Sequence, residues 1–268
     1  MEKISLTAEE RSDPDKNFGC GESKFLRQAA GRLGWLAGGT RSDLCISRLI
    51  LSTKFNSGKM RDLIMAEKAM NRVKSEDCFY IIPSGLGSVE DWSIKLYTDA
   101  SLGNLENSNS TQSFIIFLCG KNGKSAPVAW NSSRLSRVLN IILKAETLAC
   151  SASMDEAIAV KDMIEEIFRL PLNTLPVNVY IDSNSLEESL KSTTTVENKR
   201  LRRDMARIKE NLEKRFITSV NWVASKEMIA DAMTKQGVNP TRLQFIMQTG
   251  SLSEPWRRET ISSHPRDF

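Results

Sequence analysis

Histidine is almost absent from this chain of 268 residues, and its five cysteines form no motif. The single histidine, His264, lies near the C-terminal end, and no CxxC pair occurs. Structural and catalytic zinc sites draw on clusters of His and Cys, and nucleophilic triads use a histidine base. The sequence therefore argues against both kinds of site. Scattered, unpaired cysteines are typical of a reducing compartment, so we expect an intracellular protein, cytoplasmic or nuclear, that is not secreted.

Long hydrophobic runs are also missing. The longest apolar run, Phe114–Cys119, has the length of a strand and is far too short to cross a bilayer. The N-terminal stretch MEKISLTAEERSD is polar and predicts no signal peptide. These absences exclude a membrane protein from our expectations.

Positive charge is present but local. The formal net charge is +4, and residues 197–215 hold eight Lys or Arg against four Asp or Glu, which accounts for the whole excess. A single basic patch indicates a polyanionic partner such as a nucleic acid. The alternative is a solvated helix face with internal charge pairs. The candidate phosphate contacts are Lys199, Arg202, Arg203 and Arg207, and Lys235 is a further candidate.

Hydrophobic periodicity divides the chain into four parts. Residues 1–23 predict a flexible lead-in, 24–88 a small helical segment, 89–240 an α/β domain and 241–268 a C-terminal tail. In the α/β part, strands are predicted at 93–98, 112–119, 126–131, 177–182 and 216–224. A long helix is expected from about 144 to 168, a short helix after 182, a basic helix over 199–212 and another short helix from 229. This order predicts a mixed sheet, with three antiparallel strands followed by parallel ones and helices on both faces.

Four acidic residues occur in short contexts that make chemical sense together. They are Asp99 in KLYTDAS, Glu146 in LKAETLA, Asp182 in VYIDSNS and Asp231 in MIADAMTK. If the strands at 93–98 and 177–182 are adjacent and parallel, Asp99 and Asp182 lie at their carboxyl ends, where α/β sheets form their sites. Glu146 is expected in the first turn of the long helix, and Asp231 at the start of the last one.

Converging carboxylates repel each other unless divalent cations bind between them. A carboxylate cluster that holds two metal ions is a known arrangement for in-line phosphodiester hydrolysis. Each acid also has a structural explanation by itself, as a turn residue, a helix cap or a first-turn charge. The joint pattern favours a metal centre formed by Asp99, Glu146, Asp182 and Asp231.

At these residues the chain resembles the ribonuclease H domain of reverse transcriptases from Copia-type retrotransposons. YTDAS, KAETLA, VYIDSNSL and VNWVASKEMIADAMTK are similar to its four acid-bearing motifs, in the same order. Upstream, LGWLAGGTRSDLCISRLILS resembles the helical stretch that links the polymerase to that domain, so the resemblance covers about residues 25–250. It implies a ribonuclease H-like fold with a sheet of five strands.

The resemblance also implies an activity. It is endonucleolytic hydrolysis of the RNA strand of RNA–DNA hybrids, with two Mg²⁺ ions held by the four acids and Mn²⁺ as a substitute. An RNA–DNA hybrid and a reverse transcriptase polymerase domain are the implied partners. No adjacent Asp-Asp pair occurs, so no polymerase centre is expected in this chain, and the loop VASKEM lacks the histidine that cellular ribonucleases H carry. The alternative is a catalytically idle retroelement remnant that acts as a nucleic-acid-binding or scaffold module.

Overall fold

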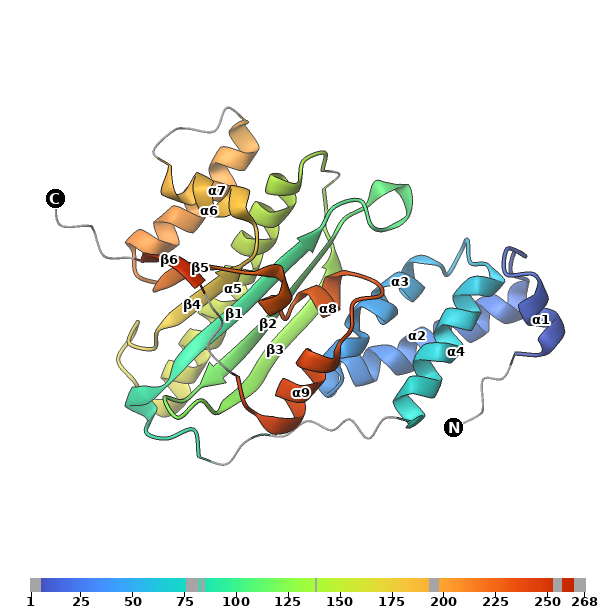
Figure 1. Ribbon diagram of the computed structural model, residues 1–268, viewed down its shortest axis with the longest axis horizontal. Helices are drawn as coiled ribbons and strands as arrows, with labels where there is room; N and C mark the ends of the chain where they lie inside the picture. The colour runs from blue at the N-terminus through green and yellow to red at the C-terminus, as the bar shows by residue number, and fades with distance from the viewer. Residues whose placement is uncertain are drawn as a thin grey trace. The chain divides into compact units, whose positions relative to one another are not determined.

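The computed structural model describes residues 6–75, 82, 85–137, 139–192, 198–252 and 257–262 (Figure 1). Parts of the predicted lead-in (1–5), of the predicted helical segment (76–81 and 83–84) and of the predicted tail (253–256 and 263–268) lie outside these residues. The chain divides into two compact units, Met1–Tyr80 and Ile81–Phe268.

The first unit is helical. Its α-helices are α1 (Ala8–Ser12), α2 (Cys20–Gly39), α3 (Cys45–Thr53) and α4 (Met60–Ser75), with the 3₁₀ helix η1 (Ser42–Leu44) between α2 and α3. Leucines on one side of each long helix form the core, because Leu26, Leu33, Leu51 and Leu63 are all at most 1% exposed. The predicted flexible lead-in, residues 1–23, contains α1 and the first turn of α2.

The second unit is built on a mixed sheet of six strands in the order β3-β2-β1-β4-β5-β6. Strands β1 (Ser93–Ser101), β2 (Thr111–Cys119) and β3 (Ser125–Arg134) form an antiparallel meander. Strands β4 (Val177–Ile181) and β5 (Ser219–Val223) continue the sheet parallel to β1. These five strands confirm the predicted ribonuclease H-like architecture.

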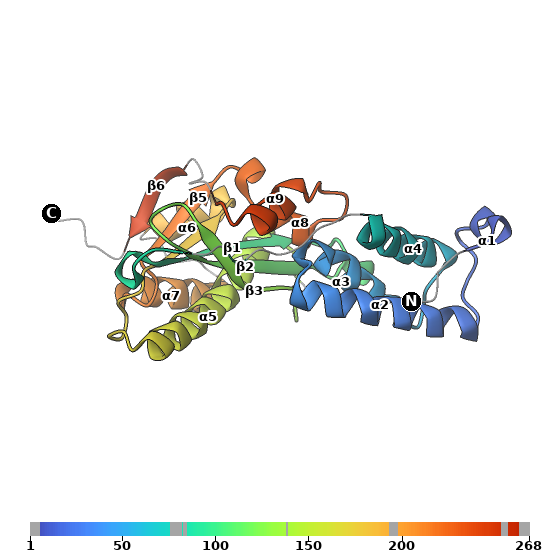
Figure 2. The same ribbon diagram turned by 90° about the horizontal axis from the view of Figure 1, so that it is seen from below.

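The helices cover both faces of this sheet. The long helix α5 (Ile142–Phe168) and the basic helix α7 (Lys199–Glu213) lie on one face, and α8 (Asp231–Thr234) and α9 (Thr241–Thr249) lie on the other (Figure 2). The remaining helices are α6 (Asn184–Lys191) and the 3₁₀ helices η2 (Val89–Asp91), η3 (Glu106–Ser108) and η4 (Ser225–Glu227). None of the helices among the described residues has a stretch long and apolar enough to cross a membrane.

The main core lies between the sheet and the pair α5 and α7. Apolar residues of β1, β4 and β5 contact Cys150 and Met154 of α5 and the buried stripe of α7. That stripe consists of Leu201, Met205, Ile208 and Leu212, which recur at helical spacing. One face of α7 packs against the core, and the basic residues Lys199, Arg200, Arg202, Arg203 and Arg207 are exposed.

Three details differ from the sequence-based expectations. The predicted tail contains α9 and a sixth strand, β6 (Arg257–Ser262), which pairs antiparallel with β5. Strand β1 continues three residues beyond the predicted end at Thr98, so Asp99 lies within the strand. Helix α5 begins at Ile142, which places Glu146 in its second turn rather than its first. An apolar helix start such as Ile142 carries no capping signal in the sequence, which is why the boundary was misplaced.

Candidate metal centre and nucleic-acid interface

The register of β1 and β4 brings Asp99 and Asp182 together. The two strands are parallel neighbours, and Tyr97 is opposite Tyr180. Each aspartate follows its tyrosine by two residues, so all four side chains share one face of the sheet. The two tyrosine rings stack with their centroids 4.7 Å apart. The condition on which the sequence-based argument depended, adjacent parallel strands, is therefore met.

Glu146 completes a close group with these two aspartates. One carboxylate oxygen from each of Asp99, Glu146 and Asp182 lies within 4.8 Å of the others. Asp99 is 0% exposed and Glu146 is 6% exposed, whereas Asp182 is half-buried. Asp182 is one residue past β4, and its main-chain carbonyl accepts a hydrogen bond from the Trp222 indole at 3.0 Å. Three carboxylates from three elements thus converge at one edge of the sheet.

Asp231, the fourth predicted acid, lies beside this group at the first position of α8. Its carboxylate forms an ion pair with the Lys235 ammonium, which is also 3.5 Å from an Asp99 oxygen. The Thr234 hydroxyl donates a hydrogen bond to the other Asp99 oxygen. We predicted Lys235 as a nucleic-acid contact, and the structure places its side chain against two carboxylates.

Buried hydroxyl groups of the antiparallel strands hold α8 in place, a feature that sequence reasoning missed. Ser113 of β2 donates to the Ala230 carbonyl at 3.0 Å, and Ser132 of β3 donates to the Met233 carbonyl at 2.7 Å. The Thr111 hydroxyl donates to the Thr234 carbonyl at 3.1 Å. The only sign of these contacts in the sequence is the alternation of hydroxyl residues along β2, at Thr111 and Ser113. Because helix ends have unpaired carbonyls, these donors fix the short helix that carries Asp231.

Burial and mutual repulsion raise the pKa of the clustered acids. Desolvation raises the pKa of Asp99 to about 8, and the neighbouring Asp231 adds to this while Lys235 opposes it. Desolvation, followed by the charges of Asp99 and Asp182, raises the pKa of Glu146 to about 9. Desolvation also raises the pKa of Asp182, although a hydrogen bond from Ser225 lowers it. Burial lowers the pKa of Lys235, but the carboxylates of Asp99 and Asp231 outweigh it and raise the pKa overall.

The donor set fits a hard divalent cation. All the converging groups are carboxylate oxygens, the ligands that Mg²⁺ and Mn²⁺ prefer, and no His or Cys among the described residues takes part. Desolvation is the main cause of the raised pKa values of Asp99 and Glu146, and the Lys235 ammonium offsets it only in part, so the ionised cluster would carry excess negative charge. A divalent cation at this edge would supply the missing charge. Asp99, Glu146, Asp182 and Asp231 are the residues that could hold it.

The predicted phosphate contacts lie on α7. Lys199, Arg202, Arg203 and Arg207 are all exposed there, and the Arg207 guanidinium is 2.8 Å from a carboxylate oxygen of Asp155 on α5. The exposed side of α7 is thus available to a partner, because its apolar stripe lies on the opposite, buried side.

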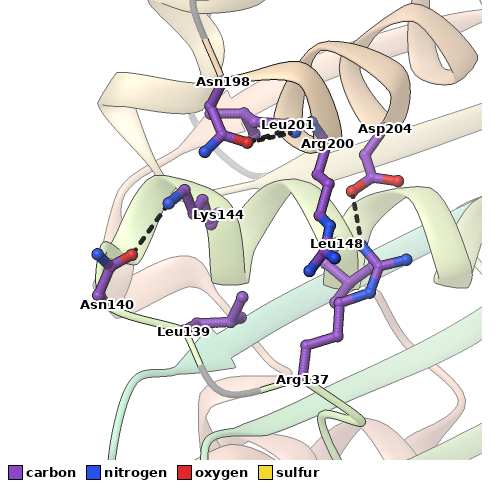
Figure 3. Close-up of a pocket in the computed structure, with 9 residues that line it drawn as sticks. All are labelled: Arg137, Leu139, Asn140, Lys144, Leu148, Asn198, Arg200, Leu201 and Asp204. Carbon is purple, nitrogen blue, oxygen red and sulfur yellow. Dashed lines mark hydrogen bonds and ion pairs between the residues drawn. The ribbon is translucent and has the colours of Figure 1, made fainter.

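Beside the start of α7 lies a cavity of about 140 Å³ that the sequence did not predict. Its polar lining comes from the segment before α5, from α5 itself and from α7: Arg137, Asn140, Lys144, Asn198, Arg200 and Asp204 (Figure 3). Lys144 donates to the Asn140 amide oxygen at 3.0 Å, and Arg137 contacts Asp204 at 3.3 Å. The lining contains three cationic side chains, Arg137, Lys144 and Arg200, and one acid, Asp204, so it suits an anionic group. Lys144 lies two residues before Glu146 on the same helix.

Comparisons with known proteins find ribonuclease H structures, but only with low sequence identity and low TM-scores. No family model matches the chain, and no curated protein matches its sequence. Among solved structures, ribonuclease H1 of Halobacterium salinarum is 20% identical over 53% of this chain and 94% of its own, with a TM-score of 0.39. The compost-derived LC11 ribonuclease H1 in complex with an RNA/DNA hybrid is 16% identical over 51% and 88%, with a TM-score of 0.38. The ribonuclease H domain of PFV is 17% identical over 62% and 98%, with a TM-score of 0.36. Because these TM-scores are low, the fold is assigned from the order and directions of the strands and not from the comparisons.

Proposed function

We propose that this chain is a metal-dependent endoribonuclease that hydrolyses the RNA strand of RNA–DNA hybrids. The observation that carries the proposal is the convergence of Asp99, Glu146 and Asp182, with Asp231 beside them, at one edge of a ribonuclease H-like sheet. The order of the four sequence motifs supports an origin in a Copia-type retrotransposon reverse transcriptase, with a polymerase domain as a partner.

In this proposal the four acids hold two Mg²⁺ ions, which Mn²⁺ can replace. Such ions lower the pKa of the attacking water and stabilise the leaving 3′ oxygen. The chain's own part is to orient the acids. The Thr234 hydroxyl holds the Asp99 carboxylate by a hydrogen bond, and the hydroxyls under α8 fix Asp231. Closely held acids need no reorganisation when the cations arrive.

The basic side of α7 would hold the hybrid. Lys199, Arg202, Arg203 and Arg207 would contact phosphates of the DNA strand, and the cavity around Arg137, Lys144 and Arg200 would receive another phosphate. We also propose Lys235 as a phosphate contact, since its side chain is 36% exposed beside the cluster. Choice of hybrid would come from minor-groove width and 2′-hydroxyl contacts rather than base sequence.

The test is hydrolysis of an end-labelled RNA–DNA hybrid with Mg²⁺, compared with duplex DNA and duplex RNA of the same sequence. We expect cleavage of the RNA strand of the hybrid alone, and loss of cleavage in Asp182→Asn. Equal cleavage of hybrid and duplex DNA would point to a nonspecific nuclease. Activity that survives in Asp182→Asn would contradict the assignment of Asp182 to the metal centre.

A catalytically idle, nucleic-acid-binding or scaffold module is the second candidate. One observation favours it: the Lys235 ammonium already neutralises part of the cluster through ion pairs with Asp231 and Asp99. The same assay separates the two candidates. Salt-sensitive binding of the hybrid without cleavage in Mg²⁺ or Mn²⁺ would support the idle module.

A further inference from the structure

The long helix α2 of the first unit packs with one side and leaves the other exposed. Helices α3 and α4 both lie on the same side of α2 (Figure 2), where Leu26 and Leu33 are fully buried. The opposite side carries residues that recur at helical spacing and are exposed, except for one half-buried arginine. These residues, which we call the outer face of α2, are Lys24, Gln28, Gly31, Arg32, Trp35 and Gly38.

Trp35 lies in the middle of the outer face and is 84% exposed, more than any other large apolar side chain among the described residues. Gly31 and Gly38 flank it, about one turn away on either side. Within the described part of the chain, nothing beyond the adjacent residues and the backbone of α2 lies within 4 Å of the position that a Cβ would take at either glycine. Close packing therefore does not require these glycines, although glycine within a helix is less favourable than alanine. They leave the indole ring open to a flat ligand.

The outer face carries charge of one sign. Lys24 and Arg32 lie on it, and the side chain of Arg48 from α3 lies along its border, 3.5 Å from the position of a Cβ at Gly34. None of these three cations forms an ion pair with another described residue. The acid of α2, Glu22, accepts a hydrogen bond from the main-chain amide at the helix start, at 3.1 Å. The positive charge around Trp35 is thus left without a counter-charge in this part of the structure.

We propose that the outer face of α2 binds single-stranded nucleic acid, with an unpaired base stacked on Trp35 and phosphates contacted by Lys24 and Arg32. Exposed aromatic rings in a positively charged setting are the elements with which proteins bind single strands, because every base has a π-face and every nucleotide a phosphate. Lys24 and Trp35 are eleven residues apart, about 16 Å along the helix axis, so the face suits an extended polyanion rather than a single anionic group. The inference goes beyond the proposed function and does not depend on the metal centre.

Two other partners fit the outer face less well. A helix that lies on a membrane buries a continuous apolar side in the lipid, but the apolar side of α2, with Leu26 and Leu33, is occupied by the core of its own unit. The centre of a protein–protein interface is depleted in charged residues, whereas Trp35 has cations beside it.

The experiment compares two labelled oligonucleotides by fluorescence anisotropy with the full chain in EDTA. One is an oligodeoxythymidine of about 16 nucleotides, and the other is an abasic oligonucleotide of the same length, which has the same phosphates but no bases to stack. The variants are Trp35→Ala and the conservative Trp35→Phe. Phe245→Ala is the matched control, because Phe245 is an aromatic residue of α9 that is 56% exposed. Melting temperatures check that each variant folds.

We expect the unaltered chain to bind the oligodeoxythymidine about fivefold or more tightly than the abasic strand, the lower end of what one stacked base contributes. Trp35→Ala should bind both strands with equal affinity, Trp35→Phe should keep most of the preference, and Phe245→Ala should keep all of it. The double variant Lys24→Gln/Arg32→Gln should weaken binding of both strands alike. Its salt slope should be shallower by roughly one to one and a half units, since each phosphate contact on a single strand contributes about 0.7.

Two results overturn the inference. One is equal affinity of the unaltered chain for the two oligonucleotides, and the other is a preference for bases that Trp35→Ala leaves unchanged. Equal affinity together with binding to phosphatidylserine vesicles that Trp35→Ala abolishes would assign the outer face to a membrane surface instead. All these results leave the proposed function intact, because cleavage of the hybrid by the unaltered chain, and its loss in Asp182→Asn, are measured separately.

Discussion

Asp99 is the member of the cluster that the fold encloses most completely, and its burial has a consequence for stability. A carboxylate without solvent exposure, next to other acids, is costly to ionise, which is why its pKa is raised to about 8. The fold retains this unfavourable group at the centre of the sheet edge. Such local cost without structural benefit is typical of a site selected for function.

The first prediction concerns Asp99→Asn. The amide keeps an oxygen that can accept the Thr234 hydrogen bond, but it carries no charge to desolvate. At pH 8 without divalent cations, we expect the free energy of unfolding to be unchanged or larger by roughly 1–3 kcal/mol. Mg²⁺-dependent cleavage should be lost. Urea unfolding with EDTA measures the first quantity, and hydrolysis of the labelled hybrid measures the second.

The control for this variant is Asp13→Asn, since Asp13 is an exposed acid in the helical unit. That change should alter neither quantity. Near-normal cleavage by Asp99→Asn would contradict the assignment of Asp99 to the metal centre.

The second prediction concerns pH. Folding raises the carboxyl pKa of Asp99 from 3.8 to about 8 and of Glu146 from 4.5 to about 9. Between these limits the folded state holds more protons than the unfolded state, so the free energy of unfolding of the metal-free protein should fall as pH rises from about 4 to 9. The raised pKa of Lys235 acts only above its ordinary 10.5 and does not oppose this trend.

Chemical denaturation with EDTA at several pH values measures this slope. Glu146→Gln should flatten it, since one of the two carboxyl groups no longer titrates. MgCl₂ should restore stability most strongly at the high-pH end, where the carboxylates are ionised. A metal-free protein whose stability is constant or increases from pH 5 to 9 would contradict the raised pKa values.

Residue spacing predicted the four acids better than it predicted their surroundings. The shared parity of Tyr97 and Asp99, and of Tyr180 and Asp182, sufficed to place two carboxylates on one face. The contacts of Thr234 and Lys235 with Asp99 depend on how the short helix α8 lies over the sheet. Periodicity carries no information on such contacts, because they join residues far apart in the chain.

At the scale of whole elements, α7 divides its two sides between the core and solvent. Its apolar residues recur at helical spacing, so the sequence alone could predict both the buried stripe and the basic side. The cavity around Arg137, Lys144 and Arg200 was not predictable in the same way, since three separate segments contribute to it. Strand β6 was missed because its residues, RRETIS, lack the hydrophobic alternation of a half-buried strand.

The third prediction tests α7. Replacing Arg202 and Arg203 with Gln should remove up to two phosphate contacts without opening the core, because both side chains are exposed. The slope of log affinity for the hybrid against log salt concentration should become shallower by roughly one to two units, since each contact contributes about 0.9. Fluorescence anisotropy in EDTA, from 50 to about 300 mM KCl, measures the slope.

Lys214→Gln is the matched control. Lys214 lies just past the end of the same helix and pairs with Glu210 at 2.5 Å, so its removal should leave the salt slope unchanged. Cleavage at saturating hybrid should also change little in the double variant, because the acids are untouched. An unchanged slope in Arg202→Gln/Arg203→Gln would mean that this side of α7 is only a solvated face.

At the scale of the whole molecule, the chain consists of two compact units, Met1–Tyr80 and Ile81–Phe268. All four acids and the basic helix belong to the second unit. The helical unit has its own leucine core and its own buried ion pair, in which Arg41 contacts Asp43 at 2.8 Å with both side chains at most 4% exposed. Each unit therefore has the internal contacts that an independent domain needs.

The last prediction follows from this division. A fragment of residues 81–268 should unfold cooperatively and should cleave the hybrid with a kcat close to that of the full chain, because every residue of the proposed site is present. Its KM reports what the helical unit adds to substrate binding. Circular dichroism during thermal unfolding and steady-state cleavage measure these properties. A fragment that ends at residue 240 lacks α9 and β6, so it should fold less stably and melt at a lower temperature. A fragment 81–268 that fails to fold, while the full chain folds, would show that the sheet depends on the helical unit.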